Sequence, residues 1–206
     1  MAYTRGSSNN IIVGAAALFT YEAGVLTDAD LPAYVDDETF KDTLEDDASF
    51  RNVGYTMNGL DIEFQPDFGE VQVDQLLDVA RLYKQGMQVN LNTAFAESTL
   101  ENLLFSLAGK DADLVSAGSE AELNLSAGDI GDVPVERGLV AVGPGSGAAN
   151  ADLERIYVAY RALSIENVTV SAKRDEPTMF EVSFRLLPND NASYGKIVDR
   201  TVPAGS

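Results

Sequence analysis

The sequence predicts a mainly β fold, a β-sandwich or partly closed barrel with one α-helix packed against its flank. Residues 60–64 and 180–186 alternate apolar and polar side chains, which is the period of a half-buried strand. Residues 99–108 instead space their leucines as a helix does. Because 45% of the 206 residues are hydrophobic, the chain can bury a core, and its length suits one all-β domain. We therefore expect a single domain over residues 1–206.

The expected strands begin near the N-terminus. An apolar run over residues 11–19 is too short to span a bilayer, so we interpret it as a buried first strand. It also lacks the layout of a secretory signal. Asn58 and Gly59 form a tight-turn signal, which predicts a hairpin between residues 53–57 and 60–64. Further strands are expected at residues 71–75, 89–95, 123–125, 139–142, 156–163, 168–172, 180–187 and 195–202.

Two segments have helical spacing. Residues 76–83 place apolar side chains at helical intervals before Gly86, which predicts a short helix. Ser98, followed three residues later by Glu101, forms a capping box at the start of a second and better-defined helix. Gly109 supplies the C-terminal stop of that helix. The second helix is predicted over residues 99–108, and its apolar stripe consists of Leu100, Leu103, Leu104 and Leu107.

The charge of the chain is strongly negative and unevenly spread. It carries 33 acidic against 14 basic residues, a net charge of −19. Residues 22–52 form a long acidic connection, for which we expect a projecting loop with a short helix near residues 39–44. A surface this acidic does not bind DNA or anionic lipid through phosphate contacts, which need lysine and arginine clusters. Solubility and a salt-rich host cytoplasm are both compatible with this composition.

The residue types that are missing exclude several kinds of catalysis. The chain has no His and no Cys, so a Ser-His-Asp triad, a thiol nucleophile and a cysteine-ligated zinc site are impossible. Gly143, Gly145 and Gly147 lack the lysine and hydroxyl residue of a phosphate-binding loop. The acidic residues 36–47 lack the glycine of a calcium loop, which leaves weak cation binding as an alternative. We expect no enzyme and no cofactor, although Asp61 and Glu63 leave acid–base chemistry by carboxylates open.

Three segments resemble the major tail tube proteins of tailed phages. They are NVGYTMNGLDIEF at residues 52–64, GEVQVDQLLDVARLYKQGMQVNLNTAFAESTLENLLFSLAG at residues 69–109, and FEVSFRLLPNDNASYGKIVDR at residues 180–200. The resemblance lies in the order of strand, polar strand and TLENLL-type helix. The three segments cover 75 of the 206 residues, and residues 22–52 and 110–150 are left without a counterpart.

The resemblance implies a structural virion protein. In the family, hexameric rings stack into a hollow tube through which viral DNA leaves without specific binding. The partners implied are further copies of the chain and tail proteins of the terminator, tape-measure and tail-tip kinds, with no membrane contact. The location implied is the virion tail, after synthesis in the host cytoplasm. There are two alternatives. One is a type VI secretion tube, which is also built from stacked rings, and the other is a monomeric acidic binding module.

Site residues follow from combining the resemblance with the pattern of charges. Acidic side chains that alternate with buried ones on strands are expected to line the lumen, where they would keep DNA from adsorbing. These residues are Asp61, Glu63, Glu70 and Asp74. Contacts between rings are expected where acids meet a basic pair, namely Asp36, Asp37, Glu38 and Asp42 against Lys173 and Arg174. The resemblance places the helix stripe of Leu100, Leu103, Leu104 and Leu107 between the sheet and neighbouring subunits.

Overall fold

The fold is mainly β with flanking helices, as the alternating patterns predict. The computed structural model describes residues 12, 14–36, 38–71, 78–117, 120–125, 130–145, 153–170, 174 and 178–202. These residues form ten strands, two α-helices and one short 3₁₀-helix, and no closed barrel. The elements are β1 (Ala17–Tyr21), α1 (Phe40–Asp46), β2 (Phe50–Asn52), β3 (Thr56–Val71), β4 (Arg81–Phe95), α2 (Leu100–Ser106), the 3₁₀-helix η2 (Asp111–Asp113), β5 (Leu114–Ala117), β6 (Glu120–Leu123), β7 (Arg137–Pro144), β8 (Leu153–Ser164), β9 (Phe180–Leu186) and β10 (Gly195–Thr201).

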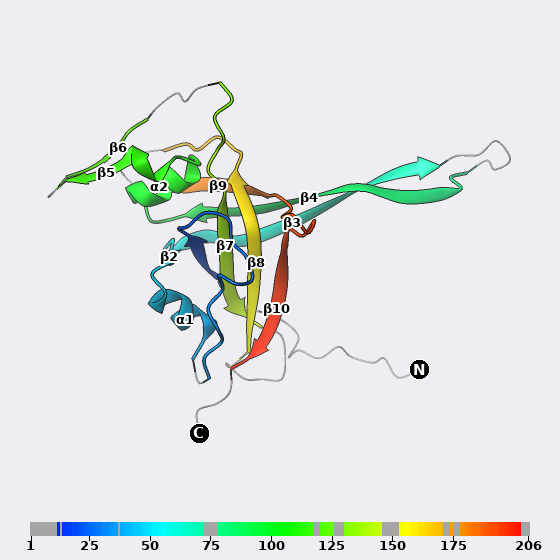
Figure 1. Cartoon of the computed structure of the whole chain (residues 1–206), viewed down its shortest axis with the longest axis horizontal. Coiled ribbons are helices and arrows are strands. Elements are labelled where there is room, and N and C mark those ends of the chain that lie inside the picture. The colour runs from blue at the N-terminus through cyan, green and yellow to red at the C-terminus, as the bar shows by residue number, and fades with distance from the viewer. Residues whose placement is uncertain are drawn as a thin grey trace.

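One antiparallel sheet builds the body of the molecule. Its strand order is β2-β1-β7-β8-β9-β4-β3, and β10 joins it beside β8. The long strand β8 is the branch point, since residues 153–159 pair with β10 and residues 162–164 pair with β9. The β9-β4-β3 part therefore lies across the β2-β1-β7-β8-β10 part as a second layer (Figure 1). A small second sheet, β5-β6, lies beside α2.

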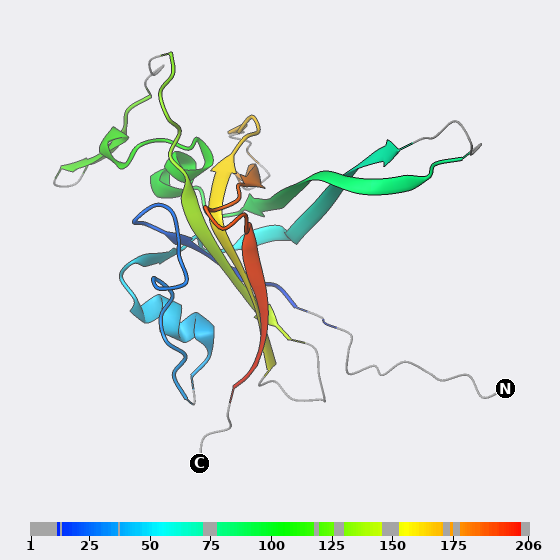
Figure 2. The ribbon, with the colours of Figure 1, turned by 45° about the vertical axis from the view of Figure 1, so that its right-hand side comes forward.

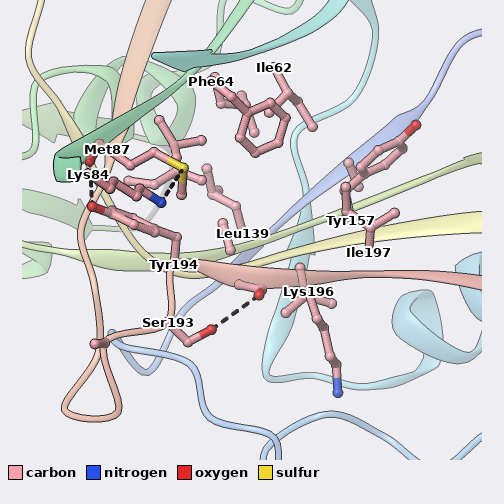
Figure 3. A pocket seen from close by; sticks show the side chains of 18 residues that line it. Ile62, Phe64, Lys84, Met87, Leu139, Tyr157, Ser193, Tyr194, Lys196 and Ile197 are labelled. Carbon is pink, nitrogen blue, oxygen red and sulfur yellow. Dashed lines mark hydrogen bonds between the residues drawn. The ribbon is translucent and has the colours of Figure 1, made fainter. Parts of the chain in front are cut away.

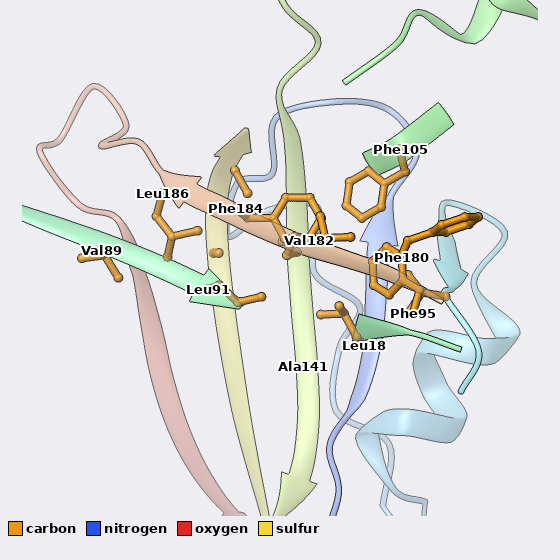
Figure 4. Close-up of a cluster of buried hydrophobic side chains, with 14 residues drawn as sticks. Leu18, Val89, Leu91, Phe95, Phe105, Ala141, Phe180, Val182, Phe184 and Leu186 are labelled. Carbon is orange, nitrogen blue, oxygen red and sulfur yellow. The ribbon is translucent and has the colours of Figure 1, made fainter. Parts of the chain in front are cut away.

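The main core fills the space between these two layers. Strands β4 and β9 supply Phe95 and Phe184, and α2 adds Phe105, whose ring centroid lies 4.8 Å from that of Phe184. Leu18 of β1 and Ala141 of β7 close the core from the other layer (Figure 4). Each of these side chains is buried, so the alternation in the sequence correctly identified the inward face of β4 and β9.

A second core covers the opposite face of β1, β7 and β8. Phe40 and Leu44 of α1 pack there against Val140 and Ile156, and all four are almost completely buried. The helix begins at the expected place because the Thr39 hydroxyl accepts a hydrogen bond from the backbone N–H of the first turn. The expectation of a projecting loop over residues 22–52 is therefore wrong. The apolar side of α1 holds this acidic segment against its own sheet.

The second helix forms as predicted, but it starts one residue later and ends two residues earlier than expected. Thr99, not Ser98, is the N-cap, because its hydroxyl accepts from the backbone N–H of Asn102. At the other end Ala108 takes the left-handed conformation with φ of 51°, and the N–H of Gly109 donates to the carbonyl of Leu104 at 3.0 Å. The left-handed residue and the hydrogen bond that follows it form a Schellman motif, with alanine at the position where glycine is more usual.

The hairpin predicted at Asn58 and Gly59 does not form. Both residues lie within the single long strand β3, where residues 58–60 stand opposite Thr93 alone. Gly59 has φ of +76°, and the Thr93 hydroxyl donates to its carbonyl at 2.9 Å. The local signal for a left-handed residue was correct, but it produces a β-bulge, because the pairing partner of β3 is the distant strand β4.

The helix predicted over residues 76–83 is also absent from the described part of that range. Leu82 and Tyr83 belong to β4 and pair with Glu70 and Gly69 of β3. Cross-strand pairing therefore overrides the helical spacing at Leu82 and Tyr83. The resulting β3–β4 hairpin projects far beyond the body in both views (Figures 1 and 2). Residues 72–77, with the expected strand continuation there, lie outside the described residues.

The remaining differences are smaller. The first strand begins at Ala17, and residue 11 lies outside the described part of the chain. Strand β5 was not predicted, whereas Leu123 is the last residue of β6 and Leu125 follows the strand. Residues 168–170 form no strand, and residues 171–172 are not described. Within the described residues, no helix is long and apolar enough to cross a membrane.

Candidate functional site

The projecting β3–β4 hairpin has a polar face that contains two of the predicted lumen residues. Asp61 and Glu63 are exposed on β3, and they stand opposite Asn92 and Asn90 of β4. Gln65 continues the row and donates to a Glu63 carboxylate oxygen at 2.8 Å. Because directly opposite residues share one face of a sheet, these carboxylates and amides form a continuous polar strip. The structure thus brings Asp61 and Glu63 together, as the alternation predicted.

The polar strip extends across a third strand. Asn92 and Asn90 pair in turn with Ser183 and Arg185 of β9, and the Ser183 hydroxyl lies 2.6 Å from the Asn92 amide oxygen. A shallow cavity of about 270 Å³ lies on this face, and Asp61, Glu166 and Glu181 contribute carboxylates to its lining. No group of three or more His, Cys, Asp or Glu side chains within the described residues could hold a metal ion.

The two other lumen candidates do not share this position. Glu70 is exposed, but it lies an odd number of residues from Asp61 and Glu63 along β3 and pairs with Leu82. Alternation therefore turns Glu70 to the apolar side of the hairpin. Asp74 lies outside the described residues. The structure therefore separates Glu70 from Asp61 and Glu63, because successive side chains of a strand point to opposite faces, and the lumen position of all four acids stays a prediction.

The opposite face of the hairpin is apolar and only partly covered. Near the body, Ile62 and Phe64 pair with Leu91 and Val89, and this face continues into the main core. Further out, Phe68 and Leu82 are each more than half exposed. Large apolar side chains that continue from a core into solvent are characteristic of an interaction surface.

A groove runs along this apolar face. We define the hairpin groove as the cavity of about 380 Å³ between the hairpin and β8 and β10 (Figure 3). Phe64 and Ile197 line it, and each is 54% exposed. A second cavity of about 320 Å³ continues from it past Tyr157 toward Gly14. Lys84 lies at one end, where its ammonium contacts the Met87 sulfur at 3.7 Å.

The described lining of the hairpin groove contains no carboxylate. Its charged side chains are Lys84 and Lys196, in a chain that carries 33 acidic residues. Lys196 turns away from the groove and donates to an Asp28 carboxylate oxygen at 2.6 Å. Lys84 is therefore the charge that the groove presents to an occupant. The groove is an apolar, weakly cationic surface on an acidic protein.

Residues of the acidic segment are bound by cationic side chains of the same chain. Arg200 of β10 donates to an oxygen of Glu154 at 2.9 Å and to the backbone carbonyls of Glu38 and Val35. Its guanidinium also stacks over the ring of Tyr34, 4.8 Å from the centroid. Strand β10 thus holds Tyr34, Val35 and Glu38 against the body.

A second cation of β10 holds the start of the same segment. Hydrogen bonds from the Lys196 ammonium and from the Tyr160 hydroxyl, at 2.6 and 2.9 Å, lower the pKa of Asp28 below its ordinary value of 3.8. Burial, followed by the nearby Asp28 carboxylate, raises the pKa of the Tyr160 hydroxyl above 10.0. Asp28 is therefore ionised and paired at neutral pH.

These pairings change the interpretation of the predicted ring contacts. Asp36 and Glu38 are exposed, and Asp42 lies in the first turn of α1, where it accepts from the Thr39 hydroxyl at 2.6 Å. Arg174 is exposed, while Asp37 and Lys173 lie outside the described residues. Contact between these acids and the basic pair of a neighbouring copy stays a prediction.

The leucine stripe of α2 is divided between core and solvent. Leu104 is buried, Leu100 and Leu103 are half-buried, and Leu107 is 45% exposed. Leu107 is thus the stripe residue that a neighbouring subunit could contact without any change in the fold. The predicted role of the stripe between subunits stays a prediction.

Sequence reasoning missed Asn102, the most connected side chain of α2. Its amide nitrogen donates to the carbonyls of Val53 and Glu97 at 2.8 and 3.0 Å, and its amide oxygen accepts from Arg51 at 2.8 Å. Asn102 is 1% exposed and ties the helix to β2 and to the segment between β2 and β3. Helical spacing places Asn102 away from the leucine stripe, so the leucine pattern gave no signal for its burial.

Comparison of the sequence with family models and with curated proteins finds no match. The fold and the site define a mainly β protein with a projecting hairpin that is polar on one face and apolar on the other. A more specific assignment has to come from the chemistry of these two faces.

Proposed function

We propose that this chain is a structural subunit of the tail-tube kind, whose copies form rings that stack into a tube conducting viral DNA. The observation that carries the proposal is the two-faced β3–β4 hairpin. Its apolar face continues from the core into solvent at Phe68 and Leu82, so a neighbour is needed to cover it. Its polar face, with Asp61 and Glu63, suits a wall that DNA must pass without adsorbing.

The free edge of β3 supports assembly. This strand is 16 residues long and, within the described residues, it pairs with β4 alone. A long strand with an unpaired edge exposes backbone donors and acceptors, and a ring of copies satisfies them by joining each edge to the next subunit.

The dimensions of the polar layer are compatible with a DNA conduit. If each copy in a hexameric ring contributes β3, β4 and β9, about 18 strands spaced about 4.8 Å apart and tilted about 40° enclose a circle roughly 36 Å across. Side chains narrow this circle by roughly 10 Å. The opening still exceeds a duplex roughly 20 Å wide.

The polar strip supplies the electrostatic property that a conduit needs. Its residues opposite Asp61 and Glu63 are the neutral Asn92 and Asn90, and the cation in the neighbouring strand is Arg185. Phosphate binding depends on clustered cations that release counterions, and one arginine among several carboxylates does not make a cluster. Salt screens these charges over roughly 8–10 Å, so only groups at the wall act on the duplex.

Negative-stain electron microscopy of the purified chain tests the proposal directly. We expect rings or short tubes, increasingly so at higher salt, because salt reduces repulsion between subunits of net charge −19. Single particles at high protein concentration, at both low and high salt, would refute it. A secretion-system tube would give similar rings, and genome context and assembly length would separate it from a tail tube.

A monomeric acidic binding module is the second candidate. The hairpin groove favours it, because a concave apolar cavity of about 380 Å³ is large enough for a small ligand. Sedimentation velocity distinguishes the two. A binding module stays monomeric as the protein concentration rises, whereas a tube subunit forms large species.

A further inference from the structure

We infer that the hairpin groove is covered by a second copy of this chain, whose loop at residues 130–133 inserts into it. The inference rests on the proposed function and adds to it the pair of surfaces that meet. One surface is the hairpin groove. The other, which we call the distal loop, presents Ile130 and Val133.

The groove is incomplete in a single copy. Phe64 and Ile197 face each other across it from β3 and β10, and both remain half-exposed. The floor consists of buried residues such as Val89 and Leu139, so an occupant would rest directly on the main core. An apolar insertion would remove the rim side chains from water, a gain of about 25 cal/mol for each Å² buried.

The distal loop, in turn, exposes apolar side chains that its own copy leaves uncovered. Ile130 is fully exposed and Val133 is 76% exposed, which places them among the most exposed large apolar side chains of the described residues. Both flank Asp132, which binds Lys110 at 2.8 Å. Neither Ile130 nor Val133 lines the groove of its own copy. An aliphatic protrusion of this size fits an apolar groove of about 380 Å³.

The charges of the two surfaces are complementary. The described groove lining offers the ammonium of Lys84 and no carboxylate. Asp132 lies in the distal loop itself, where it pairs with Lys110, and Glu120 and Glu122 lie on β6, the strand that precedes the loop in the chain. Most of this protein's surface would repel another copy, so a groove free of carboxylates is where an acidic loop can approach.

The positions of the two surfaces favour a head-to-tail contact. The distal loop lies at the end of the molecule marked by α2 and β5-β6, whereas the strands β3 and β10, which supply walls of the groove, extend away from that end (Figures 1 and 2). Two different patches that meet repeatedly generate a ring when the rotation closes and a filament when it does not. The same contact could therefore run around a ring or between rings.

Disulfide trapping tests the contact cleanly, because the chain has no native cysteine. Two single variants, Ile130→Cys and Ile197→Cys, are mixed under conditions that give rings and oxidised with copper phenanthroline. We expect heterodimers on a non-reducing gel, at least tenfold above a control mixture of Tyr55→Cys with Ile197→Cys. Tyr55 is 79% exposed, which matches the accessibility of the distal loop. The double variant Ile130→Cys/Ile197→Cys should give a ladder of higher species.

The outcomes separate the inference from the proposed function. Rings that yield no more heterodimer than the control would overturn the inference and leave the tube proposal standing. Homodimers of Ile197→Cys alone would also overturn it, because they would mean that two grooves face each other. If microscopy shows no rings for the unmodified chain, the tube proposal and the inference fall together. Thermal melting of each variant checks that the substitutions leave the fold intact.

Discussion

The carboxylate of Glu154 lies 2.9 Å from the guanidinium of Arg200, and both side chains are at least nine-tenths buried. The same carboxylate accepts the backbone N–H of Phe40 at 2.9 Å, so it also closes the first turn of α1. One buried ion pair thus joins β8, β10 and the acidic segment.

Glu154→Gln should destabilise the subunit by about 3–5 kcal/mol, because it leaves the guanidinium of Arg200 buried without its counter-ion. Urea unfolding measures the loss. The double variant Glu154→Gln/Arg200→Met removes both charges and should recover much of the stability. If the single variant unfolds within about 0.5 kcal/mol of the parent protein, the pair contributes nothing to the attachment of the acidic segment.

Two leucines of α2 should respond differently to the same substitution. Leu104→Asp buries a charge in the core and should unfold the subunit. Leu107→Asp, at a position that is 45% exposed, should leave the thermal melt unchanged. If α2 contacts a neighbouring copy, Leu107→Asp should abolish rings in negative stain.

The half-buried Leu103 should respond to Leu103→Asp with partial unfolding and loss of assembly. Normal rings from Leu103→Asp would mean that the helix is misplaced.

Stability should fall in acid partly through Asp199. Hydrogen bonds from Arg155, one of them 2.6 Å long, lower the pKa of this carboxyl below its ordinary value of 3.8. The stabilisation is therefore complete above pH 3.8 and is lost as the pH falls through the lowered pKa. Asp199→Asn should flatten the decline of unfolding free energy below about pH 4 and cost less than about 1 kcal/mol at pH 7, since the pair is half-exposed. Identical acid profiles for the two proteins would contradict this assignment.

Reversing the charge of the polar strip should turn a repelling wall into an adsorbing one. We expect tubes of the variant Asp61→Lys/Glu63→Lys to retain short duplex DNA in a salt-dependent manner, because clustered lysines bind phosphate with counterion release. Co-sedimentation of DNA with tubes is the measurement. The control Asp36→Lys/Glu38→Lys makes the same change of charge on the acidic segment, away from the hairpin. Equal retention by both variants would show that the strip does not line the conduit.

The sequence predicted the elements whose signal is local. The alternation over residues 89–95 and 180–187 appears as β4 and β9, and α2 forms where the leucine spacing predicted a helix, although Thr99 and not Ser98 caps it. The signal at Gly59 was also genuine, but it is shared by hairpin turns and bulges. Only the pairing of β3 with β4 decides between these two structures. The helical spacing near Leu82 failed for the same reason.

The candidate site was predictable to a similar extent. Alternation placed Asp61 and Glu63 on one face. The same rule, applied along an unbroken β3, would have placed Glu70 on the opposite face from these two acids. It would also have placed Glu154 on the buried face of β8, beside Ile156 and Val158. No pattern in the sequence indicated the hairpin groove, because its walls come from strands far apart in the chain.

The sequence by itself determined the strand periods, the position of α2, the absence of imidazole and thiol chemistry, and the negative charge. Each of these depends on residue identity or on neighbours a few positions away. The tertiary structure alone decided that the hairpin projects, that the acidic segment lies against its own sheet, and that an apolar groove stays open. These features depend on which distant segments pair and bury each other's apolar faces, and the contacts responsible join residues as far apart as Phe40 and Glu154.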